Sequence, residues 1–273
     1  MEWTGNLLKM ETQIPVSRKG RCEPVIYNLP IGKKRIPMNS IIGKHIHLEY
    51  LNKIHCVHCG RLTKKSFAQG FCYPCFISLP QTDACILRPE LCQAHLGISR
   101  DMAWSEKNCL QDHFVYLAIS SGLKVGVTRS SQIPTRWIDQ GAWKAIRLAR
   151  TPNRYLAGLI EVELKYFMKD KTNWRHMLTG RVEQNIDLKH EKTEAINNLS
   201  VNLQKYVSEN DEVIEIQYPV DHYPEKVKSI NLDKEPDFSG TLIGIKGQYL
   251  LFDDGHVINI RKYGGYLIRF SVI

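Results

Sequence analysis

FVYLAISSGLKVGVTRSSQIPTRWIDQGA, residues 114–142, predicts a β-hairpin followed by a short helix. Two runs rich in apolar and β-branched residues, Phe114–Ile119 and Leu123–Thr128, are typical of strands. Residues 120–122, Ser-Ser-Gly, lie between them and predict the turn, since Ser and Gly favour turn conformations. Pro134 stands near the start of the helix, where its fixed φ is tolerated.

The residues that follow extend this pattern. Arg136 falls in the first turn of the predicted helix, and WKAIRLA, residues 143–149, alternates as a strand does. Thr151 and Pro152 then suit the N-cap and first position of a second helix. The apolar face of that helix holds Leu156, Ile160, Leu164 and Phe167. The expected order of elements is β-β-α-β-α.

Both ends of the chain favour strands. In residues 1–55, Gly, Pro and Asn interrupt short apolar stretches, and HIHLEYL alternates so that Ile46, Leu48 and Tyr50 share a face. Near the other end, Asp253-Asp254-Gly255 is a strong hairpin turn signal. The two β regions fit one shared sheet or barrel as well as two separate ones.

The chain is therefore expected to be an α+β protein with a small central domain flanked by a cysteine-rich region and β-rich ends. Between the central domain and the C-terminal β region, Ala195, Leu199, Leu203 and Val207 recur every four residues, which predicts a helix. The expected segments are a β region at 1–55, a cysteine-rich region at 56–112, the central domain at 113–185, a helix at 186–215 and a β region at 216–273.

Four cysteines in HCVHCGRLTKKSFAQGFCYPCF, residues 55–76, predict a metal site: Cys56, Cys59, Cys72 and Cys75. They form two CxxC pairs with twelve residues between them. Each CxxC turn presents two thiolates to one side, and two such turns complete the four-sulfur site typical of structural zinc. Gly60 follows the first pair, where a tight turn often requires a positive φ. We expect a closed site without a catalytic position.

Three further cysteines, Cys85, Cys92 and Cys109, follow in a segment with little apolar content. His113 or His95 could supply a fourth ligand and complete a Cys3His zinc site. Zinc would then fold a stretch that cannot build its own core. The alternative is three buried free thiols that pack as small hydrophobic side chains. The sequence thus predicts one or two structural zinc ions.

Charge is unevenly distributed along the 273 residues, whose net charge is +9. Residues 113–185 carry 12 Lys and Arg against 5 Asp and Glu, a net charge of +7, whereas residues 186–273 carry 10 against 14, a net charge of −4. Such a basic segment favours a polyanionic partner, most simply DNA or RNA, although a solvated basic surface gives the same count.

The sequence gives no sign of a membrane partner or an export signal. Its apolar runs are shorter than the roughly 20 residues that a membrane span needs, and Met1–Glu11 lacks the basic and apolar order of a signal peptide. We expect a cytoplasmic protein, in which the eight cysteines stay reduced and are read first as metal ligands.

The central segment resembles the GIY-YIG nuclease superfamily. Tyr116, in FVY, is similar to the tyrosine of the first signature tripeptide, and KVG, which ends at Gly126, is similar to the second. Arg136 lies ten residues beyond Gly126, where the superfamily has its arginine, and Glu161, in EVELKYF, resembles the metal-binding glutamate. Lys124 departs from the tyrosine that is usual in the second tripeptide.

The resemblance implies catalytic roles for Tyr116, Lys124, Arg136 and Glu161. A Mg²⁺ ion on Glu161 would polarise the phosphate and the leaving group, and the Arg136 guanidinium suits phosphate oxygens. Tyr116 could orient the attacking water or accept its proton as a phenolate, and Lys124 could lower the tyrosine pKa or contact a phosphate. Three of these residues also have a plain interpretation: Tyr116 as a sheet-packing residue, Arg136 as a solvated cation and Glu161 as a surface acid.

The wider chain is also similar to a bacterial family of unknown function, which supplies no activity. That resemblance is carried by CGRLTKKSFAQGFCYPCF, VYLAISSGLKVGVTR, TRWIDQGA, TPNRYLAG and GIKGQYLLFDDG. It implies a cysteine where this chain has Ser99, so a second zinc site that used that cysteine would lack one ligand here.

Metal-dependent phosphodiester hydrolysis on nucleic acid, with structural zinc positioning the central domain, is the function that the sequence predicts. The alternative is a non-catalytic zinc-containing DNA- or RNA-binding protein on a nuclease-like scaffold. A third interpretation is a zinc-stabilised scaffold for protein interactions. The first requires that Tyr116, Lys124, Arg136 and Glu161 converge on one cleft.

Overall fold

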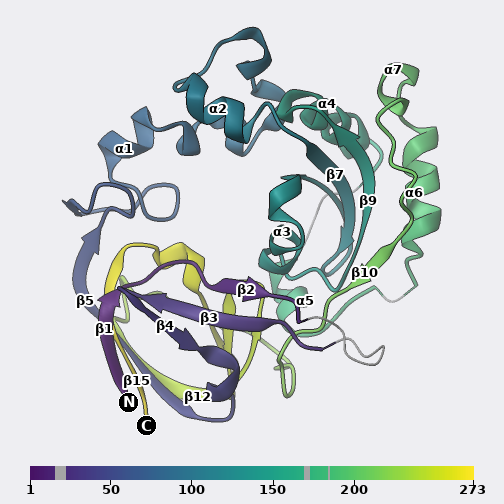
Figure 1. Cartoon of the computed structure of the whole chain (residues 1–273). Coiled ribbons are helices and arrows are strands. Elements are labelled where there is room, and N and C mark those ends of the chain that lie inside the picture. Colours follow the sequence, from purple (N-terminus) through teal and green to yellow (C-terminus); the bar gives the residue numbers. More distant parts are fainter. Residues whose placement is uncertain (16–22, 169–172, 184) are drawn as a thin grey trace. The chain divides into compact units, whose positions relative to one another are not determined.

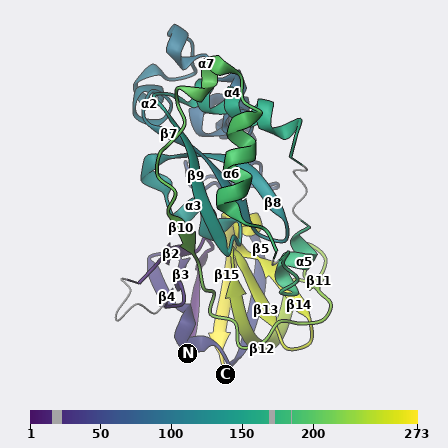
Figure 2. The same cartoon turned by 90° about the vertical axis from the view of Figure 1, so that its right-hand side faces the viewer.

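The computed structural model describes residues 1–15, 23–168, 173–183 and 185–273, so Cys22 lies outside the described residues. It is a mixed α+β structure with three sheets, which confirms the α+β class alone (Figures 1 and 2). The chain forms two compact units. Unit 1 comprises Met1–Ile77, Leu178–Gly180 and Ile216–Ile273, and unit 2 comprises Ser78–Met177 and Arg181–Glu215.

The largest sheet belongs to unit 1 and has eight strands. They are β1 (Glu2–Asn6), β5 (His45–His55), β6 (Leu62–Thr63), β11 (Lys228–Ser229), β12 (Asp237–Lys246), β13 (Tyr249–Phe252), β14 (His256–Asn259) and β15 (Tyr266–Val272). The strand order is β1-β15-β5-β12-β13-β14-β11, and β6 pairs with β5. Because β15 pairs with both β1 and β5, the two β-rich ends of the chain share one sheet.

Alternation along β5 explains its central place in this sheet. Ile46, Leu48 and Tyr50 are all buried, as their shared face predicts. Leu48 pairs with Phe270 of β15, and both side chains enter the core. The Asp-Asp-Gly turn at 253–255 joins β13 and β14, as predicted.

The remaining elements of unit 1 are short. A three-stranded sheet consists of β2 (Glu11–Gln13), β3 (Ile26–Ile31) and β4 (Lys34–Pro37), in that order. Two 3₁₀ helices, η1 (Met38–Ile41) and η7 (Ile260–Tyr263), follow β4 and β14. Helix α1 (Tyr73–Ser78) runs to the boundary between the units.

Unit 2 is built on four antiparallel strands: β7 (His113–Ile119), β8 (Leu123–Arg129), β9 (Lys144–Thr151) and β10 (Val213–Glu215). Their order is β10-β9-β7-β8. The helices of this unit are η2 (Pro80–Thr82), η3 (Ala84–Ile86), η4 (Pro89–Leu91), η5 (Ala94–Leu96), α2 (Met102–Asn108), η6 (Ser130–Gln132), α3 (Thr135–Asp139), α4 (Arg154–Lys165), α6 (Leu188–Asn197) and α7 (Val201–Gln204); α5 (Trp174–Leu178) crosses the unit boundary.

The hydrophobic core of unit 2 uses alternate residues of β7. Val115, Leu117 and Ile119 pack in one cluster with Ile160 of α4 and Ala195 of α6. The intervening Tyr116 is directed elsewhere, since successive strand residues point to opposite faces. Its ring lies edge-on to Trp137 of α3, with the ring centroids 5.9 Å apart. The sheet therefore separates a purely apolar core from the environment of Tyr116.

Two details of the predicted second helix are wrong. Asn153, and not Thr151, is the N-cap of α4, because Thr151 is still the last residue of β9. The Asn153 side chain accepts a hydrogen bond from the Leu156 backbone N–H at 3.0 Å. The helix ends at Lys165, so Phe167 is exposed and does not join the apolar face.

The single helix predicted at 186–215 is also wrong. The segment holds α6, α7 and strand β10, and β10 pairs antiparallel with β9. A helical turn cannot continue through Asn198–Ser200, where Ser200 has extended backbone angles and starts α7. Ala195, Leu199 and Leu203 are nevertheless buried, as the four-residue spacing predicts. None of the described helices combines the length and apolarity that crossing a membrane requires.

Candidate metal centre and catalytic cavity

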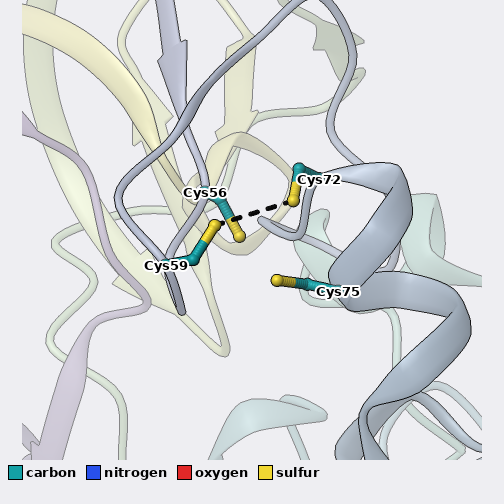
Figure 3. A group of neighbouring side chains, drawn as sticks. All are labelled: Cys56, Cys59, Cys72 and Cys75. Atoms are coloured by element: carbon teal, nitrogen blue, oxygen red, sulfur yellow. Dashed lines mark hydrogen bonds between the residues drawn. The ribbon is translucent and has the colours of Figure 1, made fainter.

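The two CxxC pairs converge in unit 1, where the four side chains point toward one another (Figure 3). Cys56 directly follows β5, and Cys75 lies within α1. All four sulfur atoms lie within 4.8 Å of one another, and those of Cys59 and Cys72 are 3.7 Å apart. Gly60 has a φ of +70°, as its place after the first pair predicts.

This donor set fits zinc. Four thiolates are soft ligands, and together they complete a tetrahedral ion without leaving a position for water. Burial raises the pKa of Cys56, but the backbone N–H groups of Cys59, Cys72 and His58 outweigh it and lower that pKa to about 6. Burial and the neighbouring thiols raise the pKa of Cys75 to about 12. A zinc ion would remove the mutual repulsion of the thiolates, so the site suits a structural ion.

Cys85, Cys92 and Cys109 form a second group of cysteines, in unit 2. They are buried in one cluster and line a cavity of about 310 Å³ together with Ser99. Within the described part of the chain, however, only the first four cysteines meet as a group of three or more ligand atoms within 4.8 Å of one another. Cys85, Cys92 and Cys109 nevertheless act on one another's pKa values, so the structure brings these three thiols together.

Neither histidine expected as the fourth ligand lines that cavity. His95 is exposed and stacks on the ring of Tyr155, with the ring centroids 4.4 Å apart. His113 is buried, and its Nδ1 donates to the backbone oxygen of Gln111 at 2.7 Å. Burial lowers the pKa of His113 to about 4, so its ring is neutral. The other ring nitrogen, Nε2, is buried without a hydrogen-bond partner among the described residues, and Cys109 acts on the pKa of this ring, so His113 stays a candidate for the fourth ligand.

Three of the four predicted catalytic residues line one cavity of unit 2, about 370 Å³ in volume. Lys124 comes from β8, Arg136 from α3 and Glu161 from α4. Lys124 is 8% exposed and Glu161 9% exposed, whereas Arg136 is half-buried. Gly126 and Gln140 also line this cavity.

Tyr116, the fourth predicted residue, lies directly behind Gly126. The two are paired across β7 and β8, and a Cβ at position 126 would lie 2.6 Å from the Tyr116 hydroxyl oxygen. Glycine therefore lets the phenol lie beneath the strand. The hydroxyl donates to Oε1 of Gln140 at 2.9 Å, and the Arg136 guanidinium also interacts with it.

The environment of Tyr116 keeps its phenol protonated. Burial raises the pKa of Tyr116 to about 12, and the charge of Arg136 opposes that rise without cancelling it. Arg136 acts on this phenol through both its charge and a hydrogen bond. A protonated hydroxyl can orient a water or hold a neighbouring side chain, but it cannot take a proton.

Glu161 is the one carboxylate that lines the cavity in the described residues. Its Oε1 lies 3.3 Å from Nζ of Lys165, one turn further along α4. One carboxylate with waters is a sparse donor set that suits weakly bound Mg²⁺, which keeps several waters. The arrangement can hold a phosphate between Lys124 and Arg136 and a divalent ion at Glu161.

The sequence does not predict several of the residues that line this cavity. Gln140 lies within TRWIDQGA, but nothing in that motif assigns it to Tyr116, which is 24 residues earlier in the chain. Ile86, Leu87 and Pro89 line the cavity although they belong to the segment expected only to bind zinc. Their contribution depends on how η3 and η4 pack against α4.

The other basic residues of the central segment are largely engaged elsewhere. Arg150 bonds Asp112, with Nε 3.0 Å from the carboxylate, and Nζ of Lys144 lies 2.7 Å from the Glu215 carboxylate. Arg147 lies over the ring of Phe114, 5.2 Å from its centroid. Arg154 is buried. These basic side chains therefore make separate contacts within the protein.

The fold and the two sites define an α+β protein. One unit holds four clustered cysteines that suit a metal ion, and the other holds a cavity lined by Lys, Arg and Glu. Residues 43–268 match the family described as a protein of unknown function, DUF2797, and the chain belongs to that family. No curated protein and no solved structure matches the chain. The likeness to GIY-YIG nucleases therefore rests on the sequence pattern and stays a prediction.

Proposed function

We propose that the cavity of unit 2 hydrolyses phosphodiester bonds of DNA or RNA with a divalent ion, and that zinc on the four clustered cysteines is structural. One observation supports this above the rest. Lys124, Arg136 and Glu161, from three separate elements, line a single cavity, and Tyr116 lies behind its glycine. A purely structural role does not explain why these four residue types lie together.

Each residue has a part in this proposal. A Mg²⁺ ion bound at Glu161 would supply charge that polarises the phosphate. Arg136 and Lys124 bind phosphate oxygens, Arg136 through its planar fork and Lys124 as a point charge. The Tyr116 hydroxyl, hydrogen-bonded to Gln140, holds the Arg136 guanidinium in place. Solvent, rather than a phenolate, takes the proton of the attacking water, because the pKa of Tyr116 is raised to about 12.

A second zinc ion belongs to the same proposal. Cys85, Cys92 and Cys109 come from three short segments that share one cavity, and an ion there would join them. Its fourth position would be taken by His113, whose buried Nε2 has no hydrogen-bond partner among the described residues, or by water.

A non-catalytic nucleic-acid-binding protein is the second candidate. The ion pair of Glu161 with Lys165 and the protonated Tyr116 favour it, because both weaken a metal-dependent site. This candidate keeps Lys124 and Arg136 as phosphate contacts and needs no ion at Glu161.

Labelled single-stranded and duplex DNA and RNA, incubated with the full chain and Mg²⁺ or Mn²⁺, test the first candidate against the second. We expect cleavage that Glu161→Gln reduces at least about 100-fold, the scale of losing a group that stabilises the transition state. Glu163→Gln is the matched control. Glu163 stands on the same helix but outside the cavity, bonded to Ser200. Tight binding without turnover under any of these conditions supports the second candidate and overturns the first.

A further inference from the structure

The candidate cavity combines two kinds of lining residue. Lys124, Arg136 and Glu161 give it charge, whereas Ile86, Leu87 and Pro89 give it an apolar part. The apolar residues come from the segment between Cys85 and Cys92, more than 30 residues before the first charged one. We call residues 86–89 the apolar wall.

The apolar wall is firmly attached to the helix that carries Glu161. A Cβ at Gly158 would lie 2.2 Å from the backbone nitrogen of Glu90 and 2.5 Å from the carbonyl carbon of Pro89. The backbone after the wall therefore lies directly on α4, in a contact that only glycine permits. Gly158 and Glu161 are three residues apart, so they lie on the same side of the helix.

Both ends of the wall are also held. Cys85 and Cys92 flank it and are buried in the thiol cluster. Backbone hydrogen bonds from Leu87 to Ala84, at 3.1 Å, and from Cys92 to Pro89, at 3.0 Å, close the turns within it. The turn before Leu87 and the contact of Pro89 and Glu90 with α4 hold the wall on both sides of Leu87, so Leu87 and Glu161 line the same cavity.

Leu87 is 86% exposed although it lines the cavity. A single exposed leucine on a protein surface needs no explanation. Here, however, a rigid support presents it beside Lys124, Arg136 and Glu161. The ligand that matches this combination carries an anionic group and an apolar face, and a nucleotide unit has both.

We propose that Leu87 contacts the face of an unpaired base while Lys124 and Arg136 hold the adjacent phosphate. The inference rests on the proposed function and names its substrate class as single-stranded or locally opened nucleic acid. Paired bases present only their edges. An apolar side chain reaches a base face only where the stack is opened, as inserted leucines do in other nucleic-acid complexes.

Binding is measured with Glu161→Gln as the parent, so that cleavage does not interfere. The probe is a short single-stranded DNA oligonucleotide with one 2-aminopurine, whose fluorescence rises when the base is unstacked. We expect the parent to bind the probe and raise its fluorescence. Leu87→Gln, similar in size but polar, should weaken binding about tenfold, as loss of most of the apolar burial of a leucine predicts, and should abolish the rise.

Two further variants make the test specific. Leu87→Met keeps an apolar side chain and should bind the probe as the parent does. Leu96→Gln changes a leucine of the neighbouring helix η5 that is 64% exposed and lines neither cavity, and it should have no effect. Leu87→Gln should also leave the salt dependence of binding unchanged, whereas Arg136→Gln should reduce its slope by about one, the loss of one phosphate contact.

Unchanged binding and fluorescence in Leu87→Gln overturn the inference, as does an equal loss in Leu96→Gln. If the unsubstituted chain still cleaves nucleic acid in that case, the proposed function stands. A chain that neither binds nor cleaves the probe overturns both. Equal affinity for a fully paired duplex, without a rise in fluorescence, overturns the assignment to an unpaired base.

Discussion

The position of the Tyr116 hydroxyl depends on Gly126. A methyl group at residue 126 would lie 2.6 Å from that oxygen and 2.7 Å from the ring carbon that bears it. Neither the buried ring nor the paired strand can move freely, since Tyr116 is fully buried and its neighbours are packed. The geometry of the candidate site therefore requires glycine at residue 126.

Gly126→Ala should destabilise the protein by about 1–3 kcal/mol, the usual cost of overpacking. The variant should also disturb the bond from Tyr116 to Gln140. Urea unfolding of both variants measures the difference. Gly122→Ala is the control, because a Cβ there would meet Glu183 Oε1 at an ordinary 3.5 Å. Equal stability of the two variants would show that the strand yields to the methyl group.

At the scale of elements, the sequence and the structure assign different residues to the start of α4. The sequence favours Thr151 and Pro152 at the helix start, but Asn153 accepts the hydrogen bond from Leu156. Asn153→Ala should cost about 1 kcal/mol, the usual loss of a side-chain cap. Pro152→Ala should cost much less, because Pro152 is exposed and precedes the cap. Thermal unfolding of the two variants checks this, and a larger loss in Pro152→Ala would support the interpretation from sequence.

Local patterns predict the elements whose partners are close in the chain. The hairpin of β7 and β8 follows from alternating apolar runs around Ser-Ser-Gly, and Ile160 and Leu164 are buried where helical spacing puts them. Strand β10 is missed because only pairing with β9, more than 60 residues earlier, makes it a strand. Gln140 and Leu87 are missed for the same reason, since their roles depend on contacts that no local pattern encodes.

At the scale of the whole molecule, the four-cysteine site and the candidate cavity belong to different units. The four cysteines belong to unit 1 and the cavity residues to unit 2. The sequence places both in neighbouring segments and gives no means of pairing the N-terminal strands with the C-terminal ones. That pairing requires the long-range contact of β5 with β12 and β15.

The segment from Cys56 to Cys75 has few buried apolar side chains of its own, and Val57, Leu62 and Tyr73 are all exposed. Zinc binding at a four-thiolate site supplies about 10 kcal/mol or more of folding free energy. Removing zinc with a chelator, or substituting Cys72→Ser, should therefore abolish protection from hydrogen exchange in residues 56–77. Strands β12 and β15 should keep theirs, because their core is apolar.

Hydrogen exchange with mass spectrometry resolves these segments, and metal analysis should show one zinc ion fewer in Cys72→Ser. Cys92→Ser is the matched variant in unit 2, and it should leave residues 56–77 protected. The two units are separately compact, so loss of protection should stay within the unit that carries the substitution. Simultaneous loss of protection in β7 and β15 after either substitution would contradict this, because it would show that the whole chain unfolds as one cooperative unit.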